Sequence, residues 1–379
     1  MGREDTWTKL RPITPGAGAS GPSTRLTPGA SIQYEGYVLR KWLIIGIEVV
    51  LLLVIGLFAL GVGAASLTMG ESLAALFGQG EPQAANIVWK LRMPRVLTAI
   101  IGGMGLALAG AAFQSVLRNP LASPSTLGVA QGAAFGASLG IIVFGAGSTV
   151  SSNVGDAVNI TNPYIVSIAA FCGAMLSTLV VLGLAQFRQI TPEAMVLAGV
   201  ALSALFSAGT TLVQYFASDV QIAAVVFWTF GDLGRASYGE VRIMAIVTLV
   251  VAVYFMANRW SYNAMESGET TAMGLGVNAN AVRLGTMVLG TGVTAVVVSF
   301  VGIISFIGLI APHIMRRFIG SDNRYLLPAA GLAGAILLLL SDLVARLAMS
   351  PVILPIGAIT SFLGGPMFLY LLFKGVGRR

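Results

Sequence analysis

Charged residues are scarce in this chain of 379 residues, where Asp, Glu, Lys and Arg together make up 10%. Soluble domains devote about a quarter of their residues to these four types, so a water-soluble fold is nearly excluded. Cysteine and histidine occur once each, as Cys172 and His313. One cysteine rules out an intramolecular disulfide, and one histidine without a Cys, Asp or Glu beside it cannot make a conventional metal site. The sequence therefore predicts that the chain holds no metal and no other cofactor.

The nucleotide-binding pattern G-x-x-x-x-G-K-[ST] is also missing, so if ATP drives this protein, another chain binds it. Few ionisable side chains lie inside the apolar runs, namely Glu48 and Asp342. Carriers driven by protons or sodium usually place such groups at mid-membrane. An intramembrane enzyme would need a nucleophile and a base, or a set of metal ligands. The scarcity of these groups favours an externally powered channel former, with the ion-driven carrier and the intramembrane enzyme as rival hypotheses.

Apolar residues are abundant: 56% of the chain is hydrophobic, in long runs. A segment that crosses a bilayer core needs about 20 apolar residues, and it must be helical because lipid offers no partner to unpaired backbone groups. The sequence predicts an all-α membrane protein, a polytopic bundle of about ten transmembrane helices. The division near Gly302 is the weakest, because residues 284–311 carry no charge, and nine or eleven spans are the alternatives. The predicted spans are 42–67, 96–117, 127–147, 164–187, 193–217, 239–257, 284–301, 303–319, 327–348 and 353–373.

Residues 1–40 differ from the rest in being rich in Pro, Gly, Ser and Thr. Such a composition predicts a disordered tail over 1–40, followed by a transmembrane domain over 41–379. Basic residues set the orientation, because they are enriched in cytoplasmic loops. With both termini in the cytoplasm most basic residues lie inside, so the net charge of +7 indicates membrane orientation and not binding to nucleic acid. The basic residues left outside are Lys90, Arg92, Arg95, Arg235, Arg242 and Arg346.

These outer arginines allow two interpretations. Arg92 and Arg95 either anchor the protein at lipid headgroups or await carboxylates of an extracytoplasmic partner, because guanidinium groups pair well with carboxylates. Arg346 has Asp342 one helical turn before it, so an internal ion pair is expected there.

Polar and small residues indicate two further segments of possible function and one site of helix packing. Gln114 and Asn119 end the second span, where they belong to a polar turn or line a water-filled path. The longest inside loop, residues 259–283, is either functional or a solvated connector. Four glycines recur every four residues, which predicts close packing of a neighbouring helix. They are Gly128, Gly132, Gly136 and Gly140.

In their order and spacing these motifs resemble those of the FecCD-type permeases, which import ferric siderophores, haem and cobalamin. The resemblance covers about residues 42–373. It rests on LRMPR (91–95), GAAFQSVLRNPLASP (110–124), LGVAQGA (127–133), WTFGDL (228–233), GLGV (274–277), FIGLIAPHIMR (306–316), SDLVAR (341–346) and LPIGAITSFLGGPMF (354–368). The chain departs from the family in its long tail and in Ile353, where the family often has an acidic residue.

The resemblance implies the architecture of a type II ABC importer permease in the cell (inner or plasma) membrane. Its partners would be a second copy of itself, two cytoplasmic ATPase subunits that hydrolyse the ATP, an extracytoplasmic substrate-binding protein, and membrane lipid. The permease itself would not be an enzyme. Its arginines would meet glutamates of the binding protein, which maps docking onto Arg92, Arg95 and Arg346. The ATPase contact would be Met273, Gly274, Leu275, Gly276 and Val277, and the translocation path or gate would involve Gln114, Asn119, Trp228, Gly231 and Gly234.

The predicted function is therefore the permease subunit of a binding-protein-dependent ABC importer for a metal chelate. Ferric siderophore is the favoured cargo, and cobalamin and haem are the alternatives. The predicted mechanism is alternating access, in which docking and ATP binding shift the populations of inward-open and outward-open dimers.

Overall fold

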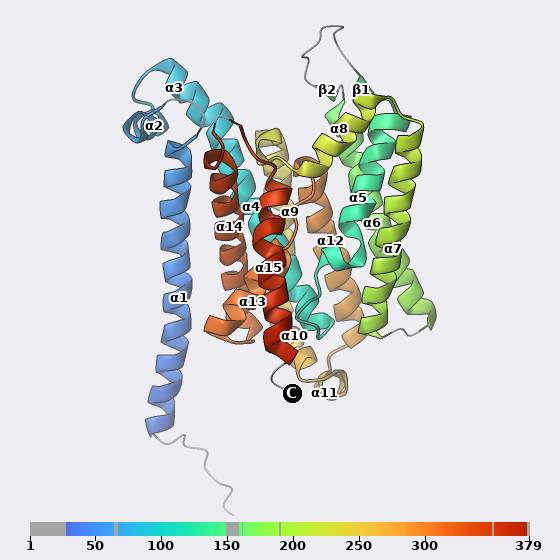
Figure 1. Ribbon diagram of the computed structural model, residues 1–379. Coiled ribbons are helices and arrows are strands. Elements are labelled where there is room, and N and C mark those ends of the chain that lie inside the picture. The colour runs from blue at the N-terminus through green and yellow to red at the C-terminus, as the bar shows by residue number, and fades with distance from the viewer. Residues whose placement is uncertain are drawn as a thin grey trace, which may run out of the picture. The chain divides into compact units, whose positions relative to one another are not determined.

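The structure is a computed structural model, and it describes residues 28–63, 67–148, 159–160, 162–188, 191–350 and 352–376. The chain divides into two compact units, Met1–Arg40 and Lys41–Arg379. Apart from the start of the first helix, every helix of the described residues belongs to the second unit. Its helices run alongside one another, with short helices at both ends of the bundle (Figure 1).

The long helices are α1 (Pro28–Gly61), α4 (Met93–Val116), α6 (Pro163–Arg188), α7 (Pro192–Tyr215), α9 (Tyr238–Ala257), α12 (Ala279–Val301), α14 (Asn323–Leu347) and α15 (Ile356–Val376). The shorter α-helices are α2 (Met69–Leu76), α3 (Pro82–Asn86), α5 (Val129–Ser138), α8 (Asp219–Phe230), α10 (Arg259–Glu266), α11 (Glu269–Gly274) and α13 (Ile307–Ile319). Two π-helices, η1 (Ile87–Arg92) and η3 (Leu139–Val143), and two 3₁₀ helices, η2 (Pro124–Leu127) and η4 (Leu233–Arg235), extend or link them. Strands β1 (Gly147–Ser148) and β2 (Asn159–Ile160) form a small antiparallel pair.

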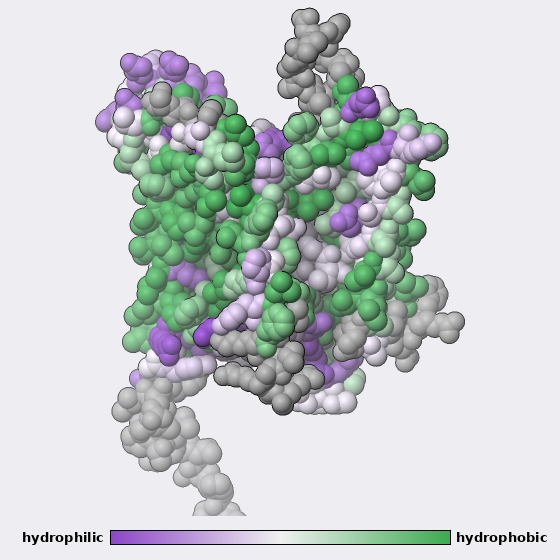
Figure 2. Space-filling model, in the orientation of Figure 1, coloured by the Kyte–Doolittle hydropathy of each residue, from purple (hydrophilic) through white to green (hydrophobic). Residues whose placement is uncertain are grey.

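The prediction of an all-α bundle of about ten spans is confirmed. Seven helices in the described residues are long and apolar enough to cross a membrane, and each of the ten predicted spans contains a helix. The apolar α8, of 12 residues, was not among the predicted spans because it is too short to cross a bilayer alone. Apolar side chains cover the flanks of the helices, and hydrophilic ones gather toward the two ends (Figure 2).

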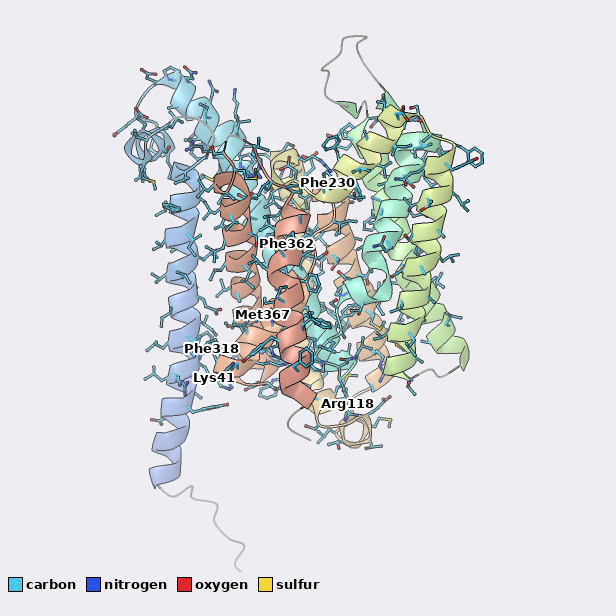
Figure 3. All side chains as sticks on the ribbon, in the orientation of Figure 1. Lys41, Arg118, Phe230, Phe318, Phe362 and Met367 are labelled. Atoms are coloured by element: carbon cyan, nitrogen blue, oxygen red, sulfur yellow. The ribbon has the colours of Figure 1, made fainter. Side chains whose placement is uncertain are left out.

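The two ends of the bundle carry different short helices, and each end is named after one of them. The α8 end carries α2, α3, η1, α8 and η4, and the α11 end carries α10 and α11 (Figure 1). Arg118 lies at the α11 end and Phe230 toward the α8 end (Figure 3).

The predicted disordered tail lies outside the described residues up to Thr27. From Pro28 onward the residues form the start of α1. Proline is favoured in the first helical turn, since its missing N–H would be unpaired there in any case. The predicted boundary at residue 40 coincides with the division between the two compact units.

Helix α4 lies at the centre of the bundle, and most of its side chains are buried. Glycines let its backbone meet those of two other helices. A Cβ on Gly103 would lie 2.4 Å from the carbonyl oxygen of Gly334 in α14, and one on Gly110 would meet the backbone of Gly308 in α13 even more closely. Contacts this short exclude any side chain, so α4, α13 and α14 pack as one closely fitted group.

The glycine ridge of α5 packs as predicted. A Cβ on Gly132 would lie 2.4 Å from the carbonyl oxygen of Gly173, and one on Gly136 would lie 2.0 Å from that of Ala169, both in α6. The prediction that a neighbouring helix approaches this ridge closely is confirmed.

The uncharged stretch 284–311 is divided at Gly302, as the ten-span prediction requires. Helix α12 ends at Val301, and α13 begins only at Ile307, after five non-helical residues. With 13 residues and a rise of about 1.5 Å per residue, α13 alone covers only about two thirds of a bilayer core. The non-helical segment 302–306 therefore joins a helix long enough to span the bilayer to one that is not.

Candidate functional site

Arg92 and Arg346 hold the carboxyl end of α1 at the α8 end of the bundle. The Arg92 Nη1 donates to the carbonyl oxygens of Leu60 and Gly61, at 2.8 and 3.0 Å. The Arg346 Nη1 donates to those of Ala59 and Val62, at 3.2 and 2.7 Å. The last carbonyls of a helix lack intrahelical partners and carry partial negative charge, so two guanidinium groups stabilise this end.

Asp342 lies between two arginines in the same region and is fully buried. Its Oδ1 accepts a hydrogen bond from the Arg95 Nε at 2.8 Å. Its Oδ2 lies 2.9 Å from the Arg346 Nε, which confirms the expected i,i+4 ion pair. The geometry of this contact does not make it a hydrogen bond. Arg95 also reaches the half-exposed Asp232, with Nη1 3.3 Å from Oδ1. We call Arg95, Asp232, Asp342 and Arg346 the arginine–aspartate cluster.

The proposed docking arginines are thus engaged within the subunit. The exposed fractions of Arg92, Arg95 and Arg346 are only 5%, 9% and 4%. Their docking role stays a prediction that rests on the resemblance. The partner of Arg346 was expected from its spacing, but that of Arg95 could not be predicted from local sequence, because Arg95 and Asp342 lie 247 residues apart in the chain.

Exposed basic side chains are present nearby at the α8 end, namely Lys90, Arg235 and Arg242. The elements that carry them are joined, because the Tyr238 hydroxyl donates to the carbonyl oxygen of Trp89 at 2.6 Å. This bond ties η1, which contains Lys90, to the start of α9, which contains Arg242.

The predicted gate residues belong to a junction of three backbones. A Cβ on Gly302 would lie 2.4 Å from the carbonyl oxygen of Trp228, and a Cβ on Gly357 would lie 2.7 Å from that of Ile303. The Asp232 N–H donates to the carbonyl oxygen of Val301 at 2.8 Å. Trp228 is buried beneath this contact. The end of α8, the segment 302–306 and the start of α15 therefore meet, and we call this contact the glycine junction.

Gly231 and Gly234, which follow α8, contact different neighbours. Gly231, at φ 73°, adopts a backbone that favours glycine and lies against Ile303 and Ile356. Gly234 is exposed and faces the guanidinium of Arg95, since a Cβ there would lie 2.8 Å from the Arg95 Nη1. A gating role for either residue stays a prediction.

Substituting Gly302 with alanine should destabilise the junction. Gly302 adopts φ 83° and ψ −170°, a region open almost only to glycine, which costs other residues about 1–3 kcal/mol. The alanine methyl would also collide with the Trp228 carbonyl. We expect a lower melting temperature in detergent. Gly292→Ala is the matched control, because no atom lies within 4 Å of its added Cβ, and equal melting of the two variants would contradict the junction.

Gln114 and Asn119, the predicted path residues, are engaged inside the subunit at the α11 side. Gln114 is buried, donates to the carbonyl oxygen of Leu309 at 3.3 Å and accepts a hydrogen bond from Arg316. Asn119 is half-buried and accepts from the Leu121 N–H at 2.9 Å, which stabilises the turn after α4. The polar-turn interpretation fits Asn119, and a path-lining role stays a prediction for both.

The loop 259–283 folds into α10 and α11 and ends in an exposed apolar tip. Met273 and Leu275 are 55% and 69% exposed, whereas Ala272 before them is fully buried. Gly274 and Gly276 are exposed too, and Val277 packs against the core. An ion pair of 2.8 Å between Arg283 and Glu269 links α11 to α12, while the apolar side chains of the tip face outward.

The sequence model of the FecCD transport family matches residues 51–374. This chain belongs to the FecCD transport family. A Methanocaldococcus jannaschii protein assigned as an ABC transporter permease is similar to it, 50% identical over 342 residues, which are 90% of this chain and 97% of the relative. The Fe(3+)-citrate import system permease of Bacillus subtilis is 36% identical over 88% of this chain and 95% of its own.

Other FecCD relatives are named for different cargoes. The hemin transport permease of Yersinia pestis is 32% identical over 88% of this chain and 96% of its own. The vitamin B12 import permease of Vibrio cholerae is 33% identical over 85% and 93%. Among solved structures, an inward-facing transporter assigned to the metal-chelate type of ABC transporters matches with a TM-score of 0.74 and 29% identity, over 87% of this chain and 99% of that one. This FecCD chain therefore has the fold of a type II ABC importer permease, and it is a multi-pass membrane protein.

Proposed function

We propose that this chain is the membrane permease of a binding-protein-dependent ABC importer for a metal chelate, most simply a ferric siderophore. The match to the FecCD family over residues 51–374 carries the proposal. Relatives named for ferric citrate, hemin and vitamin B12 support a metal-chelate cargo, with haem and cobalamin as the alternatives. ATP would be hydrolysed by partner subunits, and this chain would bind no cofactor of its own.

We also propose that the α11 end and both termini face the cytoplasm. Basic residues at this end support this, since cytoplasmic loops are rich in them. They include Arg118, Arg259, Arg283, Arg316, Arg317 and Arg324. The exposed apolar tip at Met273 and Leu275 is the proposed contact for the ATPase subunits, because exposed apolar side chains mark interaction sites.

A second copy of the chain is proposed to pack against α7. Only 11% of the most apolar stretch of α7 is buried within the subunit. Its exposed side includes small side chains at helical spacing, which permit another helix to approach closely. They are Ala201, Ala204, Ala208 and Thr211. Other exposed apolar surfaces would face lipid.

The binding protein is proposed to dock on the α8 end, and the exposed Lys90, Arg235 and Arg242 are better placed for direct contact than the buried arginines. Reversing all three charges to glutamate should weaken the affinity of the binding protein by about tenfold or more at low salt, through slower association. Surface-plasmon resonance on the reconstituted complex would measure this. Arg118→Glu, at the opposite end, is the control. An unchanged affinity would return the docking role to Arg92, Arg95 and Arg346.

Uptake into proteoliposomes tests the whole proposal. Vesicles would contain this chain, its ATPase and its binding protein, and receive a labelled ferric siderophore, haem or cobalamin. ATP-dependent uptake of one cargo is expected. If the chain is instead an ion-driven carrier, uptake should continue without the ATPase and should stop when an ionophore removes the ion gradient. Glu48 would then be the first residue to test, since it is buried on α1 without a hydrogen-bond partner among the described residues.

A further inference from the structure

The side chains of α10 join three transmembrane helices at the α11 end. Glu266 is the centre of these contacts. Its Oε1 accepts a hydrogen bond from Ser115 of α4 at 2.6 Å and lies 3.3 Å from the Asn323 Nδ2 of α14. The same oxygen lies 3.4 Å from the Arg316 Nη2 of α13. One carboxylate oxygen thus contacts α4, α13 and α14.

Asn263, one turn earlier on α10, makes a second set of contacts with the start of α14. Its Oδ1 accepts from the Asn323 backbone N–H at 2.8 Å and from the Asn323 Nδ2 at 3.0 Å. Its Nδ2 donates to the Oδ1 of Asp322, the N-cap of α14, at 3.0 Å. The first turn of α14 is therefore fixed to α10 through both backbone and side chain.

Because the groups are buried, losing these hydrogen bonds would cost free energy. Ser115 and Asn323 are fully buried, and the side chains of Arg316 and Glu266 are only 18% and 23% exposed. A buried polar group that loses its partner bears its full desolvation penalty. The ends of α4, α13 and α14 will therefore follow a displacement of α10 more readily than they will separate from it.

The same helices reach the opposite end of the bundle. Arg95 lies at the α8 end of α4, and Asp342 and Arg346 lie at the α8 end of α14. Between the two ends α4 and α14 touch backbone to backbone at Gly103 and Gly334. The pair is thus held together at both ends and in the middle, which is the property of a rigid body.

We infer that Glu266 and Asn263 are positioning residues that transmit movement of the ATPase contact loop to α4, α13 and α14, and through α4 and α14 to the α8 end. Helix α11, which follows α10 directly, would push or pull on this network when the ATPase subunits close. The inference rests on the proposed function, because it takes the α11 tip as the ATPase contact.

Coupling between ATP hydrolysis and uptake tests this role. In the reconstituted complex, Glu266→Ala should lower the number of cargo molecules imported per ATP by about tenfold, within the usual range of coupling between sites. Stimulation of the ATPase by cargo-loaded binding protein should fall with it. Copurification with the ATPase should persist, because the α11 tip is unchanged. Glu266→Gln, which keeps a hydrogen-bond acceptor, should retain part of the coupling.

Glu35→Ala is the matched control, since it removes an exposed glutamate on α1, outside the contact loop and its network. It should leave the ratio of uptake to ATP unchanged. If Glu266→Ala does not assemble, Asn263→Ala, which removes no charged side chain, gives the same reading. A normal ratio in an assembled variant would overturn the inference while the proposed function stands. Failure of the wild-type complex to import any chelate would instead overturn the proposed function.

Discussion

Replacing Asp342 with alanine is expected to lower the free energy of unfolding of the subunit by about 3–5 kcal/mol, the usual cost of removing one partner from a buried ion pair. The carboxylate stands between Arg95 and Arg346, with its oxygens 2.8 and 2.9 Å from the two Nε atoms. Without it, two guanidinium groups would face each other in a buried site. Thermal unfolding in detergent, followed by circular dichroism, would measure the loss.

Asp219→Asn is the control for this variant, because Asp219 is exposed at the start of α8. Its removal should change stability by no more than about 0.5 kcal/mol. A variant with Asp342, Arg95 and Arg346 all replaced by apolar residues of similar size should recover much of the stability, since well-packed apolar groups often replace buried ion pairs without loss. If Asp342→Ala melts like the wild type, the cluster does not stabilise the fold.

Replacing Met273 and Leu275 with aspartate should abolish binding of the ATPase subunits. Both side chains are more than half exposed, and burial of each in a partner groove is of the kind that makes interface hot spots, worth about 2 kcal/mol or more per residue. Two such losses predict a fall in affinity of about a thousandfold. Copurification of the tagged permease with its ATPase would measure it, and uptake should be lost as well.

The folded state should survive this double substitution, because both positions already face solvent at the α11 end. Phe77→Asp is the control: Phe77 is 78% exposed, in the loop after α2 at the opposite end, so ATPase binding should be unchanged. Normal copurification of the Met273 and Leu275 variant would move the ATPase contact to another part of the subunit.

Much of the fold follows from local features of the sequence. Long apolar runs predict the spans, and glycine spacing predicts the contact of α5 with α6, because both signals lie within one segment. The pair Asp342 and Arg346 is also local, separated by one helical turn. Helix α8 was missed since 12 apolar residues do not suffice for a span, and nothing in its own sequence tells where it packs.

The candidate sites were less predictable because their partners are distant in sequence. Arg95 finds Asp342 247 residues away, and Ser115 finds Glu266 151 residues away. A basic residue at the end of a span looks the same in sequence whether it meets lipid, a partner protein or a buried carboxylate. Only the three-dimensional packing distinguishes them, and it assigns Arg92 and Arg346 to the end of α1 within the subunit.

The non-helical segment 302–306 limits what can surround it in a membrane. The backbone N–H groups of residues 303–306 have no acceptor among the described residues, and Ile303, Ser305 and Phe306 remain partly exposed. In a hydrocarbon environment each such group costs several kcal/mol, so backbone of this kind is tolerated only against protein or water. Acyl chains cannot solvate this segment. Protein or water must therefore cover these N–H groups, and packing against α8 and α15 at the glycine junction already provides part of that cover.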